Sequence, residues 1–343
     1  MTATPTAIDL FAGCGGLTTG LKRAGFRVLA AVEIDEKISE TYFANHPEVH
    51  IFPKDIRNRE ILEDLLSLIN LKRGELDLLA GCPPCQGFSR IRRRNKQEAH
   101  PDERNDLVQC FSSLVNLLFP KVVMMENVPG MEMDERFSVF VSHLENLGYK
   151  IDHGILDLDK FGVPQRRKRL VLLASRTDKV PNIAEIAPSD ATTVRETIGD
   201  LPPPEESNNA LHKLVLNNTD TVKKRIAAIP KDGGSRSQLP EELTLECHRR
   251  RKNNGFRDVY GRMAWDGVSP TITGGCFNPS KGRFVHPDQD RAISIFEASL
   301  LQSFPRDYVF FPEFGICRNA EMIGNALPPK FAEAVSKYAL ELL

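Results

Sequence analysis

The chain has 343 residues, of which 41% are hydrophobic and 27% charged, which is enough for a large core and one big domain with a smaller insertion. Its seven cysteines lack regular spacing, which argues against a disulfide framework, and no apolar run approaches membrane-spanning length. The net charge of −1 excludes little, because an average hides local patches. Met1–Pro5 lacks the charged and apolar regions of a signal peptide, so we expect a soluble cytoplasmic protein.

The first predicted strand, Ala7–Phe11, leads through the glycine-rich turn Ala12–Gly16 into a helix that begins near Leu17. Glycines let the backbone approach a ligand closely and direct amide N–H groups at it. The next strand, Val28–Val32, ends at Glu33, and an acidic residue in that position accepts hydrogen bonds from ribose hydroxyls. The turn and the acid together indicate a nucleoside site without identifying one cofactor.

Strands and helices continue to alternate, with strands predicted at 50–52, 76–80 and 122–125 and helices at 59–71 and 106–119. This alternation predicts a mostly parallel sheet with its site along the carboxyl ends of the strands. Cys85 and Glu126 both fall at that edge. Glu126 follows an apolar strand directly, so it is either a paired structural carboxylate or a group tuned for proton transfer. The Asn127–Gly130 stop favours the second interpretation.

Cys85 lies behind two prolines in the segment Gly81–Ser89 (GCPPCQGFS), and each proline fixes its own φ and restricts the residue before it. The basic loop Arg90–Lys96 suits a polyanion and would favour a thiolate if it lies near the sulfur. Cys82 and Cys85 could instead be a redox or zinc pair, or Cys85 a buried inert cysteine. A redox pair should open a helix, and zinc needs a second pair. Covalent chemistry on nucleic acid is therefore the favoured interpretation.

After a helix predicted at 137–147, the segment Gln165–Arg169 precedes a strand at Leu170–Ala174. Alternate residues of an extended segment face the same way, so Gln165, Arg167 and Arg169 are expected to share one side. Two guanidiniums and an amide suit a phosphate or a base edge. A surface arginine strip ahead of a strand is an equally good interpretation.

Residues 176–261 lack the alternation of strands and helices, and a basic run begins within them at Cys247. Between Cys247 and Phe284 only Asp258 and Asp266 oppose Arg249, Arg250, Arg251, Lys252, Arg257, Arg262, Lys281 and Arg283. A charge run is usually a solvated face, but two basic clusters beside a chemical site favour contact with a phosphate backbone. The Cys247-His248 pair has no partner pair, so we reject a metal site there. A C-terminal helix predicted at 322–343 would pack back on the first domain.

The chain strongly resembles the DNA (cytosine-5)-methyltransferases, through motifs that occur in the order found in that family. These are 9–16 (DLFAGCGG), 83–86 (PPCQ), 126–128 (ENV), 165–169 (QRRKR), 262–275 (RMAWDGVSPTITGG) and 324–329 (GNALPP). The resemblance spans about residues 7–175 and 260–343, and the ordered set is highly specific. It implies an α/β fold, a class I Rossmann-like methyltransferase sheet with a smaller target-recognition domain. The implied division is 1–175 for the catalytic domain, 176–289 for target recognition and 290–343 for a segment that returns to the catalytic domain.

The resemblance also implies S-adenosylmethionine as the cofactor, without a metal. Phe11 would stack on adenine, and Glu33 would hold the ribose. Asp55 and Ile56 would contact the adenine. The pocket would be completed by Gly13, Gly15, Gly16, Leu17 and Asn325.

By the same resemblance, Cys85 adds to C6 of cytosine while Glu126 binds the N3/N4 edge, so that C5 can attack the methyl sulfonium. Loss of the C5 proton and expulsion of Cys85 then restore the ring. Arg167 would steady the base or the adjoining backbone, and Arg169 the base O2. The target base must leave the helix, because its C6 cannot be reached inside the stack, and the loop 86–104 would close over it. Cys82 has no assigned role.

The implied function is sequence-specific C5 methylation of cytosine in double-stranded DNA by a monomer at the nucleoid of a prokaryotic or phage-infected cell. A restriction endonuclease acting on the same site is a candidate partner. One alternative is a transfer-RNA cytosine-5 methyltransferase of the same family, against which the long basic recognition segment counts. Another alternative is a DNA-binding protein that has lost catalysis. The presence of the complete catalytic set, Cys85, Glu126 and the arginines, argues against this alternative.

Overall fold

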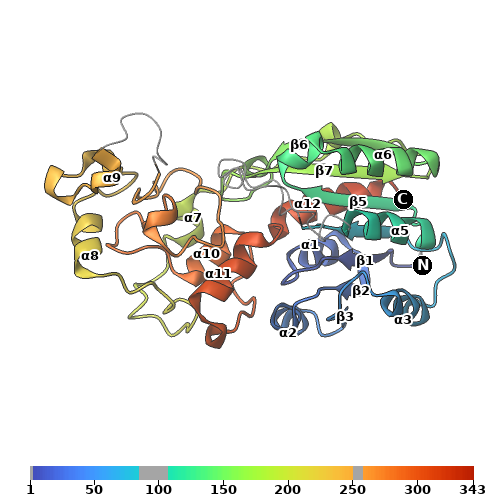
Figure 1. Cartoon of the computed structure of the whole chain (residues 1–343), viewed down its shortest axis with the longest axis horizontal. Helices are drawn as coiled ribbons and strands as arrows, with labels where there is room; N and C mark the ends of the chain where they lie inside the picture. The colour runs from blue at the N-terminus through green and yellow to red at the C-terminus, as the bar shows by residue number, and fades with distance from the viewer. Residues whose placement is uncertain (1–2, 85–106, 250–257) are drawn as a thin grey trace. The chain divides into compact units, whose positions relative to one another are not determined.

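The computed structural model describes residues 3–84, 107–249 and 258–343 (Figure 1). The chain divides into two compact units. Unit 1 comprises Met1–Phe161, Lys168–Pro188 and Leu327–Leu343, and unit 2 comprises Gly162–Arg167 and Ser189–Ala326. Residues 290–326, which the resemblance assigns to the segment returning to the catalytic domain, belong to unit 2 in this division.

Within the described residues, unit 1 is built around a seven-stranded sheet in the order β3-β2-β1-β4-β5-β7-β6. Its strands are β1 (Thr6–Leu10), β2 (Arg27–Val32), β3 (His50–Phe52), β4 (Leu78–Gly81), β5 (Val122–Asn127), β6 (Lys150–Asp157) and β7 (Lys168–Ser175). β1 to β5 pair in parallel, whereas β7 runs antiparallel to both β5 and β6. The predicted α/β fold with a mostly parallel sheet is confirmed, and β6 is a strand that the sequence analysis missed.

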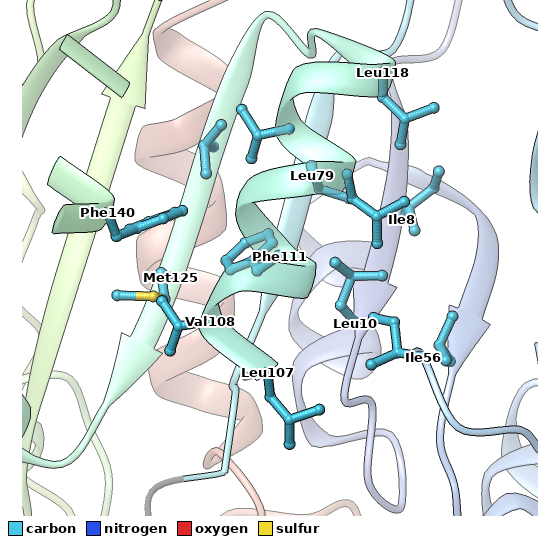
Figure 2. Close-up of a cluster of buried hydrophobic side chains, with 14 of the residues drawn as sticks. Ile8, Leu10, Ile56, Leu79, Leu107, Val108, Phe111, Leu118, Met125 and Phe140 are labelled. Carbon is cyan, nitrogen blue, oxygen red and sulfur yellow. The ribbon is translucent and has the colours of Figure 1, made fainter. Parts of the chain in front are cut away.

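One face of this sheet carries the main hydrophobic core. Alternate strand residues point to the same face, so Ile8 and Leu10 of β1 lie there together with Leu79 of β4. The face is covered by α3 (Arg59–Ile69), α5 (Leu107–Leu118) and α6 (Glu135–Asn146). Figure 2 shows Phe111 of α5 among these side chains, and its ring stacks on Phe140 of α6 with centroids 5.4 Å apart.

The opposite face is covered by α1 (Gly16–Ala24) and α12 (Pro329–Glu341), and α2 (Glu36–Asn45) packs near β3. The hydroxyl of Thr18 in α1 donates to Asp9 of β1, which fixes α1 over this face. The two helices approach so closely that a Cβ added at Gly20 would overlap Ala332. Only glycine permits such an approach.

The prediction of one continuous helix at 322–343 is wrong, because the chain forms two helices there. α11 (Gly315–Asn325) ends before the pair Pro328-Pro329, and α12 begins at the second proline. Proline has no N–H to donate and restricts the residue before it, so a continuous helix cannot pass this point. α11 belongs to unit 2 and α12 to unit 1.

Unit 2 consists, in its described parts, mainly of loops and short helices. Besides α11 these are α7 (Val194–Ile198), α8 (Asp220–Ala227), α9 (Glu246–Arg249) and α10 (Ile295–Leu301). None of the helices in the described ranges of either unit has the length and apolarity needed to cross a membrane.

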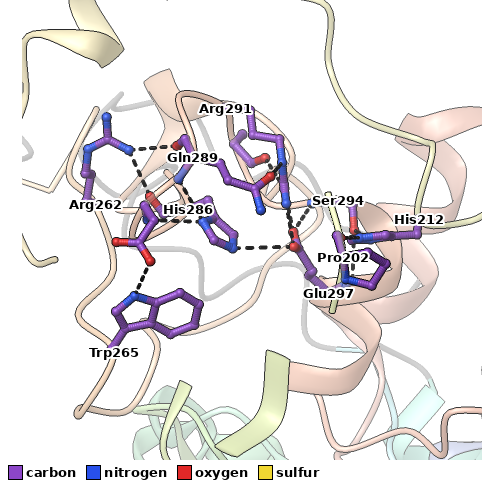
Figure 3. Close-up of polar contacts among 11 residues, drawn as sticks. Pro202, His212, Arg262, Trp265, His286, Gln289, Arg291, Ser294 and Glu297 are labelled. Carbon is purple, nitrogen blue, oxygen red and sulfur yellow. Dashed lines mark hydrogen bonds and ion pairs between the residues drawn. The ribbon is translucent and has the colours of Figure 1, made fainter. Parts of the chain in front are cut away.

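Unit 2 contains a network of polar contacts among buried side chains (Figure 3). The fully buried Arg262 donates to the carbonyls of Ile226, Ile229 and His286 at 2.9 to 3.0 Å. The buried Glu297 accepts two hydrogen bonds of 2.7 Å from Arg291. Because their hydrogen-bonding atoms have partners, these buried charged side chains can fix the positions of the loops that they contact. Arg262 is therefore structural, and its expected place in a phosphate-facing basic cluster is wrong.

Candidate cofactor and catalytic site

The glycine-rich turn after β1 adopts left-handed backbone conformations. Phe11, Gly13 and Gly15 have φ angles of 59°, 55° and 94°. For Phe11, which has a Cβ, this conformation is strained, and such strain often occurs where a backbone meets a ligand. A Cβ built on Gly13 would meet no atom within 4 Å, so the space beside the turn is open. The turn therefore has room for a ligand.

Glu33, directly after β2, ties this turn to the neighbouring strand. Its carboxylate accepts the N–H of Gly13 at Oε2 and that of Asp35 at Oε1, both at 3.0 Å. Burial raises the pKa of Glu33 above its ordinary value, and the two amide donors oppose that shift. Each carboxylate oxygen has a further lone pair, so Glu33 can still accept from two ribose hydroxyls.

The residues expected to contact adenine behave differently from one another. The carboxylate of Asp55 pairs with the guanidinium of Arg57 at 2.5 Å, and this hydrogen bond holds the pKa of Asp55 below its usual value. The side chain of Ile56 is buried in the sheet core, so only its main-chain atoms can face a ligand. Ile34, which the sequence analysis did not single out, has an apolar side chain that is 61% exposed beside Glu33. An apolar residue next to a strand-end acid was the available signal.

A buried histidine contacts the main chain of the glycine-rich turn. His46 Nε2 lies 3.3 Å from the carbonyl oxygen of Gly15, and Nδ1 lies 3.3 Å from Nζ of Lys22. Burial, and then the charge of Lys22, lower the pKa of His46 to about 4. The neutral ring therefore donates from Nε2 to Gly15 and accepts at Nδ1 from Lys22.

Asp9 lies beneath the same turn and is fully buried. Its Oδ2 accepts from Thr18 Oγ1 at 2.7 Å, and Thr18 Oγ1 lies 2.7 Å from the hydroxyl of Tyr42. Oδ1 has no hydrogen-bond partner within the described residues. Burial raises the pKa of Asp9 to about 7, with the hydrogen bond from Thr18 opposing the shift. An acid in the middle of an apolar strand was the sequence signal for this group, and no role was predicted for it.

Glu126 and Arg169 meet at the edge where β5 and β7 pair. Nε of Arg169 lies 2.6 Å from Oε1 of Glu126, and the two side chains are 14% and 9% exposed. A buried carboxylate with a guanidinium at one oxygen still has acceptor positions for a ligand. The structure thus brings together two of the predicted catalytic residues.

Cys82 reaches Glu126 from the other side, at the end of β4. Gly81 pairs with Met125, so the following residues, Cys82 and Glu126, lie side by side at the ends of neighbouring strands. Burial first, and then the charge of Glu126, raise the pKa of Cys82 well above its ordinary value. Cys82 is therefore a protonated thiol. The predicted nucleophile Cys85 and the loop 86–104 lie outside the described residues.

The segment Gln165–Arg169 does not form the expected single row. Arg169 belongs to unit 1, whereas Gln165 and Arg167 belong to unit 2. The buried guanidinium of Arg167 donates to the carbonyls of Ile272 at 2.8 Å and Gly324 at 3.1 Å. Gln165 accepts from the N–H of Ile272 at 3.1 Å. These two side chains therefore connect the loop at Ile272 with the end of α11 within unit 2.

The remaining predicted residues are placed as follows. Asn325 ends α11 in unit 2 with an exposed side chain. In the second basic cluster Arg249 and Lys281 are exposed, and Arg283 pairs with Asp258 at 3.3 Å. Residues 90–96 and 250–257 lie outside the described residues. Over the described part of the chain, no three His, Cys, Asp or Glu residues are arranged to hold a metal ion.

A family profile described as C-5 cytosine-specific DNA methylase matches residues 6–341. The chain belongs to this family. It is 36% identical over 340 residues to the type II methylase M.HgiDII of Herpetosiphon aurantiacus, covering 96% of this chain and 93% of the relative. It is 32% identical over 343 residues to the type II methyltransferase M1.HphI of Haemophilus parahaemolyticus, covering 98% and 87%. The methylase is thus a DNA cytosine-5 methyltransferase, and its family uses S-adenosylmethionine.

The fold of the methylase is also found among solved structures. A DNA modification methyltransferase encoded within an E. coli prophage superimposes with a TM-score of 0.73 at 24% identity, and the match covers 99% of both chains. At this identity the likeness shows the fold alone. It confirms the expected Rossmann-like methyltransferase sheet.

Proposed function

We propose that the methylase modifies a cytosine that has been flipped out of double-stranded DNA, at a specific sequence, through a covalent adduct with Cys85. The observation that carries this proposal is the carboxylate of Glu126, held between Arg169 and Cys82 at the carboxyl edge of the sheet. Ligands of open α/β sheets bind at this edge. Cys85 follows β4, the strand that pairs with β5, after a short proline-stiffened segment.

The chemistry follows from the weak nucleophilicity of cytosine C5. When the thiolate of Cys85 bonds to C6, the ring electrons move towards C5 and N3, and Glu126 holds a proton at the N3/N4 edge. Arg169, beside Glu126, stabilises charge at the base O2. Once C5 carries the methyl group, it loses its proton, the C6–S bond breaks and Cys85 leaves as the thiolate. The target base must be extrahelical for the sulfur to reach C6.

The residues around the glycine turn fit S-adenosylmethionine, which when bound supplies an electrophilic methyl group. Glu33 provides acceptors for the ribose, and the open side of Gly13 leaves room for the ligand. Phe11 and the exposed Ile34 offer apolar surface for a flat adenine ring. The roles of Gly15, Gly16, Leu17, Asp55, Ile56 and Asn325 in cofactor binding remain part of this proposal.

Unit 2 is proposed to read base edges in the major groove, with the exposed Lys281 available to phosphates and the exposed Arg249 held by Glu241. The buried contacts of Arg167 support a role in holding the loop at Ile272 against the end of α11 at Gly324. In a prokaryotic cytoplasm, a restriction endonuclease that cuts the same sequence is the proposed partner, and the methylase is proposed to act as a monomer.

Bisulfite sequencing of DNA from cells that express the methylase tests this proposal. The wild type should leave cytosines protected in one sequence context of duplex DNA, and Cys85→Ser should leave none. Cys317→Ser, which removes an exposed thiol in α11, is the matched control and should protect the same sites. Protection by Cys85→Ser, or protection that appears in transfer RNA and not in DNA, would contradict the proposal.

A further inference from the structure

Cys82 is fixed by the sheet rather than by the loop that follows it. Its N–H donates to the carbonyl of Leu10 in β1 at 3.2 Å. The carbonyl of the next residue, Pro83, accepts from Nδ2 of Asn127 in β5 at 3.0 Å. The main chain around Cys82 is therefore tied to a strand on either side, which fixes the position of its Cα and Cβ atoms.

The carboxylate of Glu126 has a polar side chain on the neighbouring strand to each side. Arg169 of β7 contacts Oε1 at 2.6 Å, and Cys82 lies beside Glu126 at the end of β4. The terminal torsion of a glutamate has a broad energy profile, so an unsupported carboxyl group can rotate. A second donor opposite Arg169, on the strand at the other side, would restrict that rotation and set the direction of the remaining lone pairs.

We propose that Cys82 is a positioning residue, whose thiol holds the carboxyl group of Glu126 in the orientation that meets the N3/N4 edge of the target cytosine. This inference rests on the proposed catalytic role of Glu126. The charged groups that face the sulfur are Glu126, Asp9 and Arg169, and the two carboxylates favour the protonated thiol. Cys82 consequently donates a hydrogen bond and does not compete with Cys85 as a nucleophile.

Single-turnover methyl transfer tests the inference, with enzyme in excess over a duplex that carries the site found by bisulfite sequencing. Cys82→Ala should lower the rate about tenfold, while the dissociation constants for S-adenosylmethionine and DNA change less than about twofold. Cys82→Ser keeps a donor of similar size and should restore most of the rate. Cys110→Ala removes another partly buried thiol, on α5, and should leave the rate unchanged.

A double-mutant cycle with Glu126→Gln shows whether Cys82 acts through Glu126. Cys82→Ala should slow the residual reaction of Glu126→Gln far less than it slows the wild type. The inference is overturned if Cys82→Ala reacts at the wild-type rate, if Cys82→Ser is as slow as Cys82→Ala, or if the two losses multiply. Melting curves identify a variant that fails to fold, and if Cys82→Ala is such a variant, Cys82→Val carries the cycle, because valine also removes the donor. If the wild type itself transfers no methyl group, the proposed function fails instead.

Discussion

Arg169 and Glu126 form an ion pair between β7 and β5, with Nε 2.6 Å from Oε1. In the sheet register Glu126 stands opposite Val171, so the guanidinium of Arg169 reaches back across the strand end to the carboxylate. Both side chains are largely buried. Removing one partner would leave a buried charge without compensation, so this pair matters for stability as well as for chemistry.

Arg169→Ala should therefore lower the free energy of unfolding by about 3 kcal/mol and also slow methyl transfer strongly. Lys168→Ala is the control, because it breaks an exposed pair with Asp157 at 3.1 Å, and such pairs contribute less than about 1 kcal/mol. Urea denaturation at neutral pH measures both variants. Equal stability losses would argue against the importance of the buried pair.

Glu33→Gln should weaken S-adenosylmethionine binding about tenfold or more. The amide has only one acceptor oxygen, whereas Gly13 and Asp35 each donate to a different oxygen of the Glu33 carboxylate. The raised pKa of Glu33 predicts that wild-type affinity falls as the pH drops through that pKa, when a proton occupies one acceptor. Isothermal titration calorimetry measures both effects. Glu40→Gln, on the exposed side of α2, should bind like the wild type, and a pH-independent affinity would contradict the role of Glu33.

Asp9→Asn should show the stability cost of a buried carboxylate. The folded pKa of about 7 lies above the ordinary value of 3.8, so the folded state holds the proton more tightly than the unfolded state. The contribution of Asp9 to the free energy of unfolding of the wild type is then greatest below pH 4, and it falls as the pH rises through 7. The free energy of unfolding of Asp9→Asn relative to the wild type should rise over this interval, by at most about 4 kcal/mol. Urea titrations at pH 5 and pH 8 test this, and a constant difference would refute it.

Gly20→Ala should destabilise the methylase by about 2 kcal/mol or more, because the added Cβ would overlap Ala332 and separate α1 from α12. Gly267→Ala is the control, since its Cβ would meet only an ordinary contact at 4.0 Å. Thermal melting of the two variants measures the difference. A wild-type melting temperature for Gly20→Ala would show that α12 can move away at little cost.

The sequence predicted the parallel part of the sheet because apolar strands and amphipathic helices alternate there. β6 escaped because Lys150–Asp157 mixes charged, apolar and glycine residues without strict alternation, as a partly exposed edge strand can. The break between α11 and α12 had a clear signal in Pro328-Pro329, which the sequence interpretation overlooked.

Individual residues of the site were predicted where their role depends on strand position. Glu126 and Glu33 follow strand ends, and the parallel sheet alone brings such residues to one edge. The partners of Arg167 were not predictable, because they are main-chain carbonyls 105 and 157 residues away in the sequence. The contact of Cys82 with Glu126 required the pairing register of β4 and β5, which the pattern of side chains does not specify.

The central claim concerns the sulfur of Cys85, and intact-mass spectrometry tests it most directly. The methylase is incubated with S-adenosylmethionine and a duplex that contains 5-fluorocytosine at the target position, which blocks loss of the proton equivalent at C5. We predict a covalent protein–DNA species that carries the transferred methyl group, is mapped by peptide analysis to Cys85 and is absent in Cys85→Ser. Binding of both ligands without any such species, or a species linked through Cys82, would contradict this account.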